Sequence, residues 1–285
     1  DNPLSPFIPI SPFFPVIPST HTQLRRHLRW LRGGYCMLLA LAMTSLTVSA
    51  HAGTTRIAVA SNFAAPIKVL VQAFEANSPH RVAVALGSTG KLYAQITYGA
   101  PFDALLAADQ ATPARLVSDG RAQASSLHTY AQGLLAFWSQ QPITDDPITQ
   151  HGPWAAIRSG KLRHIAIAEP KLAPYGRAAV EALTHTQTWQ PAQPFLVFGD
   201  SIAQTYQFVA VGAADAGFLA FSQLKAAGKA DQATVWLVPQ ALYTPLKQDM
   251  VVLNNGVNNP ATVAFMAFLK SPAARARIAE LGYLE

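Results

Sequence analysis

Short apolar runs alternate with segments of helical periodicity along most of this chain. The runs 55–60, 81–86 and 103–108 have the length of strands, and helical patterns lie between them at 65–78 and 91–99. A β-α-β-α-β order predicts a parallel sheet covered by helices, with ligands at the carboxyl ends of the strands. Half of the 285 residues are hydrophobic, which is enough to bury one large or two modest cores.

The α/β pattern restarts after residue 133. Strand-like runs at 133–139, 164–170 and 195–199 are interleaved with helical patterns. We therefore expect a second α/β lobe over residues 134–239. The last apolar segments are best placed back on the first lobe, which then comprises residues 53–133 and 240–285.

The N-terminal residues 1–52 have the features of a leader rather than of a folded domain. A Pro-rich stretch is followed by four clustered arginines, an apolar run at 37–48 and the small-x-small sequence Ala50-His51-Ala52. This order predicts a secretory signal peptide that is cleaved after Ala52, and hence a periplasmic protein. The run of about a dozen residues is short of the roughly 20 that span a bilayer, so an uncleaved anchor is the weaker alternative. Cys36 would leave with the signal, so the mature protein should contain no cysteine.

The formal net charge of +6 does not indicate a nucleic-acid partner. The clustered arginines belong to the predicted signal, and the remaining basic residues are scattered singly. Because no basic helix face or aromatic-interleaved patch is visible, we expect no binding to nucleic acid.

The sequence Gly87-Ser88-Thr89-Gly90-Lys91 has part of a nucleotide phosphate loop. The complete motif also needs a glycine five residues before Gly90 and a hydroxyl residue after Lys91, where this chain has Ala85 and Leu92. The sequence therefore argues against ATP. The underlying mechanism remains available, because small residues let backbone N–H groups at a helix start approach an anion.

Four segments share a position between a predicted strand and a predicted helix. They are 61–62, 88–89, 174–176 and 200–202, two in each lobe. A helix start has unpaired N–H groups and the positive end of the helix dipole, so several starts in one cleft can bind a small dianion without Lys or Arg. The alternative for each segment taken singly is an ordinary helix N-cap.

One long block, "GSTGKLYAQITYGAPFDALLAAD" at 87–109, resembles the periplasmic molybdate-binding proteins of ABC importers. The segments "VASNFAAP", "EPKLAPYGRAAVEAL" and "FLKSPAARARIAELGY" extend the resemblance over nearly all of 54–285. The resemblance implies an α/β, two-lobed type II periplasmic binding protein fold, whose ligand cleft lies between lobes joined by crossing hinge strands. It also implies binding of molybdate and tungstate and delivery to an ABC permease in the inner membrane, by a monomer with no cofactor and no enzymatic activity.

The same resemblance implies which residues contact the anion. Ser61 and Ser88 match hydroxyl donors, whereas Tyr175 and Ile202 match positions that donate a backbone N–H. These four would hold molybdenum through the oxygens of molybdate. Where many members have a tyrosine whose hydroxyl touches the anion, this chain has Ala220. A donor is therefore lost or replaced.

Three groups are candidates to replace the missing donor. Asn62 and Thr89 are each adjacent to a matched serine and carry a side-chain donor, and the Tyr175 hydroxyl is the other candidate. Molybdate is fully deprotonated at neutral pH, so its oxygens only accept hydrogen bonds and a carboxylate in the pocket would be repelled. We accordingly expect Asp200 to cap its own helix. Sulfate would be rejected by cleft size, whereas tungstate should be accepted.

The remaining conspicuous residues have ordinary explanations. Asp103 and Asp109 bracket a strand and are expected to cap strand ends, and the histidines after residue 52 lack metal-ligand spacing. Two alternative functions stay open, namely a carrier of sulfate or phosphate and an enzyme on the same architecture. The enzyme is disfavoured because no nucleophile-plus-base pattern or G-x-S-x-G motif is found. A ligand-sensing domain of a regulator would require a DNA-binding segment.

Overall fold

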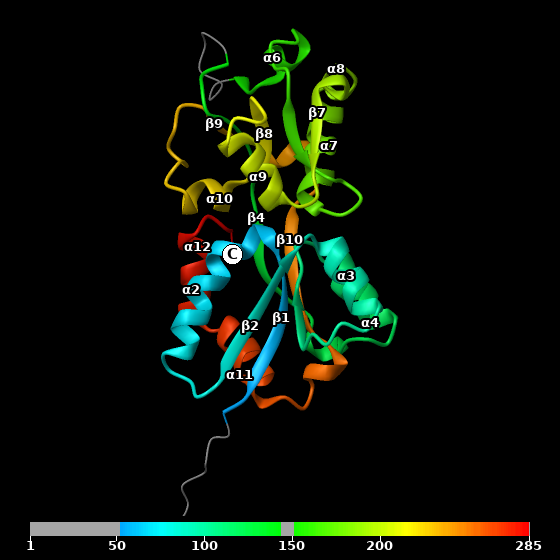
Figure 1. Cartoon of the computed structure of the whole chain (residues 1–285), viewed down its shortest axis with the longest axis vertical. Helices are drawn as coiled ribbons and strands as arrows, with labels where there is room; N and C mark the ends of the chain where they lie inside the picture. Colours follow the sequence, from blue (N-terminus) through cyan, green and yellow to red (C-terminus); the bar gives the residue numbers. More distant parts are fainter. Residues whose placement is uncertain (1–51, 144–150, 285) are drawn as a thin grey trace, which may run out of the picture. The chain divides into compact units, whose positions relative to one another are not determined.

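The computed structural model describes residues 52–143 and 151–284 (Figure 1). The predicted Pro-rich extension, the signal peptide with Cys36 and its cleavage site up to residue 51 lie outside the described residues. Two five-stranded sheets form the framework. Among the described helices none is both long and apolar enough to span a bilayer.

The first sheet has the strand order β2-β1-β3-β10-β4. The strands β1 and β2 are parallel, as are β1 and β3, whereas β10 is antiparallel to both β3 and β4. The bounds are β1 Thr54–Ala60, β2 Arg81–Gly87, β3 Ala104–Leu106, β4 His128–Gly133 and β10 Leu246–Val252.

Helices cover both faces of this sheet, which explains why its central strands are apolar at consecutive positions. Ile57 and Val59 of β1 pack in one cluster with α2, α11 and α12. Ala58, which points to the other face, packs with Leu92 of α3 and Leu116 of α4. The helix bounds are α2 Ala64–Glu75, α3 Thr89–Thr97, α4 Ala111–Ser118, α11 Pro260–Leu269 and α12 Pro272–Glu280.

The second sheet has the order β7-β6-β8-β5-β9 and is also mixed. β6 is parallel to β7 and β8, and β5 is antiparallel to β8 and β9. Ile165 and Ile167 of β6 face α7, whereas Ala166 faces α9. The strand bounds are β5 Leu135–Ser139, β6 Ile165–Ala168, β7 Leu196–Gly199, β8 Ala216–Ala220 and β9 Val235–Leu237. The helix bounds are α6 Trp154–Arg158, α7 Pro174–His185, α8 Trp189–Ala192, α9 Ile202–Ala210 and α10 Phe221–Ala226.

The chain crosses between the sheets twice. β4 ends at Gly133 and β5 begins at Leu135, so the first crossing is a single residue, and the second crossing lies between β9 and β10. The run 133–139, which we predicted as one strand, thus holds the last residue of β4 together with β5. Two crossing segments therefore connect two lobes. The lobe boundaries given above, at residues 133/134 and 239/240, remain predictions.

The prediction of a parallel first sheet is correct for β1, β2 and β3 and wrong for its other half. β10 and β4 enter antiparallel, because the chain returns to this sheet from the second lobe. Each of the four predicted strand-to-helix junctions is present, although a short 3₁₀ turn, η1 (Ser61–Phe63), comes between β1 and α2.

Candidate functional site

One small pocket between the lobes is lined by the six residues that were predicted to contact the anion. Its lining includes Ser61, Asn62, Ser88, Thr89, Tyr175 and Ile202. The other lining residues are Ala60, Gly87, Ala108, Ala173 and Pro174, so no side chain that lines it carries a formal charge. The pocket has a volume of about 10 Å³, which is room for a single water-sized group.

The Ser88 hydroxyl is available to a ligand. Ser88 is the N-cap residue of α3, yet its side chain makes no capping hydrogen bond to that helix. The residue is 3% exposed, and Oγ has no hydrogen-bond partner among the described residues. A buried hydroxyl without a partner costs free energy, and an acceptor in the pocket would remove that cost.

Asn62 and Thr89 differ in what their side chains already contact. Asn62 Nδ2 lies 2.9 Å from Gln248 Oε1 and 3.0 Å from Tyr283 Oη, whereas its Oδ1 is buried and lacks a partner within the described ranges. Thr89 Oγ1 accepts a hydrogen bond from Ala108 N at 3.1 Å, which leaves its own proton to donate. Thr89 can therefore still donate to an anion, whereas the unpartnered atom of Asn62 is an acceptor.

Tyr175 and Ile202 lie in the first turns of α7 and α9, where the helix supplies no acceptor for the backbone N–H groups. α7 approaches the end of β6 very closely at Gly176, where a Cβ would collide with the Ala168 carbonyl oxygen. The glycine therefore allows the start of α7 to reach the pocket.

The Tyr175 hydroxyl is directed at the hinge. It lies 3.3 Å from Gln248 Nε2, and a Cβ added to Gly133 would collide with it. Burial raises the pKa of Tyr175 well above its ordinary value, and burial has the same effect on the pKa of Tyr130. Both hydroxyls therefore stay protonated at neutral pH.

The prediction that Asp200 caps its own helix is wrong. The N-cap of α9 is Ser201, whose Oγ accepts from Gln204 N at 3.3 Å. The Asp200 carboxylate is instead 2.6 Å from Lys91 Nζ of the other lobe. Sequence spacing missed this pairing because the two residues are far apart in the chain. Ala220 ends β8, is fully buried and does not line the pocket.

Several contacts join the lobes around the pocket. Among them are the Lys91–Asp200 pair, the pair of Arg177 Nη2 with Asp109 Oδ2 at 2.6 Å, and a hydrogen bond from Gly90 N to Leu172 O at 2.9 Å. Asp109 also accepts from Thr112 N at 3.0 Å, and Asp103 accepts from Arg56 N at 2.6 Å. Asp103 thus bonds the backbone of the neighbouring strand β1 as expected, whereas Asp109 binds the first turn of α4 and contacts the second lobe.

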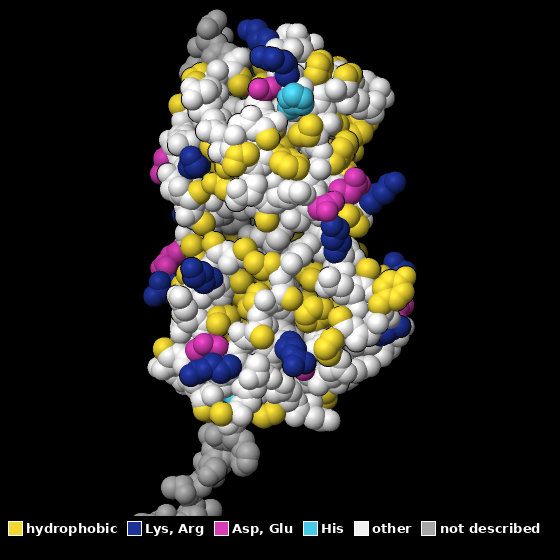
Figure 2. Space-filling view, in the orientation of Figure 1, with side chains coloured by type: hydrophobic (Ala, Val, Ile, Leu, Met, Phe, Trp, Pro, Cys, Tyr) yellow, Lys and Arg dark blue, Asp and Glu magenta, His cyan; other side chains and the backbone are white. Residues whose placement is uncertain are grey.

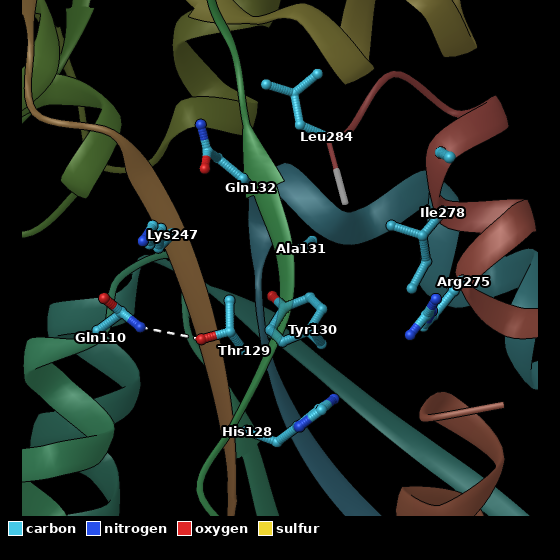
Figure 3. Close-up of a pocket in the computed structure, with 11 residues that line it drawn as sticks. Gln110, His128, Thr129, Tyr130, Ala131, Gln132, Lys247, Arg275, Ile278 and Leu284 are labelled. Carbon is cyan, nitrogen blue, oxygen red and sulfur yellow. Dashed lines mark hydrogen bonds between the residues drawn. The ribbon is translucent and has the colours of Figure 1, made fainter. Parts of the chain in front are cut away.

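A larger hollow of about 350 Å³ lies beside β4 and contains none of the predicted residues (Figure 3). Its lining mixes basic and apolar side chains, among them Lys247, Arg275 and Ile278. Figure 3 shows Tyr130 and Thr129, which belong to β4. It also shows the hydrogen bond of 3.0 Å between Gln110 Nε2 and Thr129 Oγ1. Helix starts from both lobes do not meet in this hollow. It is therefore a weaker candidate for an anion-binding site than the pocket between the lobes.

Residues 52–143 and 151–284 lack the features of two other kinds of site. No group of three or more His, Cys, Asp or Glu side chains is placed there to hold a metal ion. On the face shown in Figure 2, basic and acidic side chains are dispersed and no broad basic patch is visible. That face offers no surface of the kind that nucleic-acid binding requires.

The protein has two α/β lobes, and the chain crosses between them twice. The pocket lies between the lobes, at the ends of their strands. These features define a two-lobed binding protein of type II. The chain belongs to the bacterial extracellular solute-binding protein family, whose family model matches residues 55–284. The fold class predicted from sequence is confirmed.

Two curated relatives are similar to this chain over most of its length. The molybdate-binding protein ModA of Azotobacter vinelandii is 42% identical over 248 residues, covering 87% of this chain and 96% of the relative. ModA of Rhodobacter capsulatus is 42% identical over 254 residues, covering 89% and 96%. The resemblance found in the sequence is confirmed by these two relatives.

Solved structures agree with this assignment. The periplasmic molybdate-binding protein of Azotobacter vinelandii superposes with a TM-score of 0.75 at 33% identity, covering 81% of this chain and 99% of that one. The sulfate-binding protein SubI of Mycobacterium tuberculosis, at 15% identity and a TM-score of 0.64, covers 82% of this chain and 86% of its own, and shows a shared fold alone.

Proposed function

We propose that this protein binds molybdate, and also tungstate, in the periplasm and delivers it to the permease of an ABC importer. The observation that carries the proposal is a pocket between two lobes whose lining includes no charged side chain and at least one buried hydroxyl without a partner, Ser88. The names of the relatives, which share 42% identity with this chain, support the same ligand.

The proposed contacts use donors from both lobes. Ser61 and Ser88 donate hydroxyl protons, and Tyr175 and Ile202 donate backbone N–H groups from helix starts. Fixed dipoles at α3, α7 and α9 balance the two negative charges of the anion without a buried cation. Since both lobes contribute, anion binding favours the closed arrangement over the open one.

Asn62 is the proposed replacement for the tyrosine that is missing at Ala220. Its Oδ1 is buried without a partner, and turning the amide by 180° would present Nδ2 in its place, with loss of the hydrogen bonds from Nδ2 to Gln248 Oε1 and Tyr283 Oη. Thr89 is the second choice, because Ala108 N already holds its oxygen. The Tyr175 hydroxyl is a weaker choice, since Gln248 and Gly133 adjoin it.

Calorimetric titration of the protein without its first 52 residues tests the proposal. Molybdate, tungstate, sulfate and phosphate are added in turn. Tight one-to-one binding of molybdate and tungstate with no heat from sulfate is expected. Tight sulfate or phosphate binding would instead show a carrier of another tetrahedral anion, and heat from none of the four would reopen the enzyme alternative.

A further inference from the structure

The C-terminal residues of the first lobe lie against the second lobe. α12 ends at Glu280, and Gly282 follows with a φ of 93°. A Cβ added to Gly282 would lie 3.2 Å from Phe221 Cδ1 and 3.3 Å from Lys225 Cδ, both in α10. The missing side chain therefore lets this turn pass close to α10.

Tyr283 comes next in the chain, and its side chain lies beside the turn η1. The residue is 4% exposed, and its ring meets the edge of the Phe63 ring, with the two centroids 5.3 Å apart. Phe63 is the last residue of η1, the turn that carries Ser61 and Asn62. Packing on Phe63 thus holds the Tyr283 ring next to two residues of the pocket.

The Tyr283 hydroxyl has three partners among the described residues. Its Oη lies 2.8 Å from the Asn62 carbonyl oxygen, 3.0 Å from Asn62 Nδ2 and 3.0 Å from Ser222 Oγ. A carbonyl oxygen can only accept, so the single hydroxyl proton is directed there, and Oη accepts from the other two groups. Burial raises the pKa of Tyr283, so the hydroxyl keeps this proton at neutral pH.

These contacts hold Asn62 at its main chain and at its side chain. Tyr283 binds the carbonyl oxygen and one Nδ2 proton, and the other Nδ2 proton is directed to Gln248 Oε1 at 2.9 Å. Asn62 follows Ser61 directly, so fixing Asn62 also fixes the backbone that carries the Ser61 hydroxyl. The anion contacts of this turn therefore depend on a hydroxyl that does not line the pocket.

Ser222 belongs to the second lobe, whereas both of its partners belong to the first. It lies in α10, is 2% exposed, and its Oγ is 3.0 Å from Tyr283 Oη and 3.3 Å from the Asn62 carbonyl oxygen. These bonds require the lobes to be close together, whereas the bonds between Tyr283 and Asn62 lie within the first lobe. Closure thus adds Ser222 to a pair that the first lobe already forms.

We infer that Tyr283 is a positioning residue, which holds the turn carrying Ser61 and Asn62 and joins this turn to Ser222 of the second lobe on closure. It acts through Asn62 rather than by touching the anion. The inference rests on the proposed function for its consequence in anion binding. Because Tyr283, Asn62 and Ser222 are all buried and uncharged, salt should weaken their hydrogen bonds little, unlike the exposed ion pairs between the lobes.

The first test needs no anion, so it separates this inference from the proposed function. The side-chain amide signals of Asn62, assigned by their loss in Asn62→Ala, are compared by NMR between the wild type and Tyr283→Phe, which keeps the ring on Phe63. The Asn62 signals should shift because Nδ2 loses an acceptor, whereas those of the exposed Asn77 should stay in place. Unchanged Asn62 signals would overturn the inference, whatever the protein binds.

The second test is a double-mutant cycle of molybdate affinity with Tyr283→Phe, Ser222→Ala and both together. In the wild type, Ser222→Ala should weaken binding about 3- to 10-fold, because closure loses a buried hydrogen bond. In Tyr283→Phe it should cost less than about twofold, since only the 3.3 Å contact to Asn62 remains. Equal costs in both backgrounds would contradict the inference. Thr262→Val, at a buried hydroxyl of the first lobe that pairs with Thr55, is the matched control and should keep its affinity.

The third test compares the molybdate affinities of the wild type and Tyr283→Phe at low and high sodium chloride. The ratio of the two affinities should stay constant within about twofold, because the lost hydrogen bonds are buried and uncharged. A ratio that approaches one at high salt would assign the loss to the exposed ion pairs and overturn the role of Tyr283. A wild type that binds no molybdate would refute the proposed function, and the NMR comparison would then decide the inference alone.

Discussion

At the level of single residues, Asn62 is the proposed substitute for the tyrosine hydroxyl that is absent at Ala220. Asn62→Ala removes a donor to a charged ligand, so molybdate affinity should fall by about 1.5–3 kcal/mol in a calorimetric titration. Asn77→Ala, at an exposed asparagine whose Nδ2 bonds Ala73 O at 3.1 Å, is the matched control. Unchanged affinity in Asn62→Ala would transfer the role to Thr89.

The sequence identified the residues of the candidate pocket but not those behind it. Ser61, Ser88 and Ile202 were found because each begins a helix after an apolar strand, and this pattern is local. Gln248, Tyr130 and Tyr283 are single polar residues in apolar surroundings. Nothing in their spacing shows that folding brings Gln248 and Tyr283 to Asn62 and Tyr130 to Gln248, so only the three-dimensional arrangement reveals these contacts.

At the scale of elements, the start of α9 gives a stability prediction. Ser201 Oγ accepts from Gln204 N, so Ser201→Ala should lower the free energy of unfolding by about 1 kcal/mol. Urea denaturation measures the change. Asp200→Asn should change the stability less, because Asp200 is not the cap. The opposite ranking would restore the capping role that sequence reasoning gave to Asp200.

Helices and central strands were predictable, whereas the completion of the sheets was not. Periodicity marks α7 and β6 within a few residues of their bounds, and Gly99 and Gly212, with φ of 90° and 75°, follow helix ends as expected. β9 has only three residues, and β10 pairs with strands more than 100 residues away. Pairings of this kind depend on contacts that no local pattern encodes.

At the scale of the whole molecule, two ion pairs hold the lobes together around the pocket. In the Lys91–Asp200 pair the side chains are 46% and 68% exposed, and in the Arg177–Asp109 pair they are 45% and 16% exposed. Exposed pairs contribute little individually and are screened by salt. They should therefore adjust closure rather than determine whether the anion binds.

Replacing Lys91 and Arg177 by methionine tests this adjustment. Molybdate affinity should fall roughly two- to fivefold at low salt, and its dependence on ionic strength should become weaker than in the wild type. Titrations at low and high sodium chloride measure both effects. Arg115→Met, which removes an ion pair with Asp119 and a cation–π contact with Tyr93, both within the first lobe, is the control. Equal salt dependence in the double variant and the wild type would argue against a role for the pairs in closure.

The uncharged lining of the pocket has an electrical consequence for the protein as a whole. Because no charged side chain lines the pocket, a bound dianion is not neutralised there, and a filled molecule carries two more negative charges than an empty one. Full and empty forms therefore migrate differently in a native gel, apart from any change in shape. For the proposed permease, filled and empty proteins would differ in charge, and long-range electrostatics would help it to distinguish them.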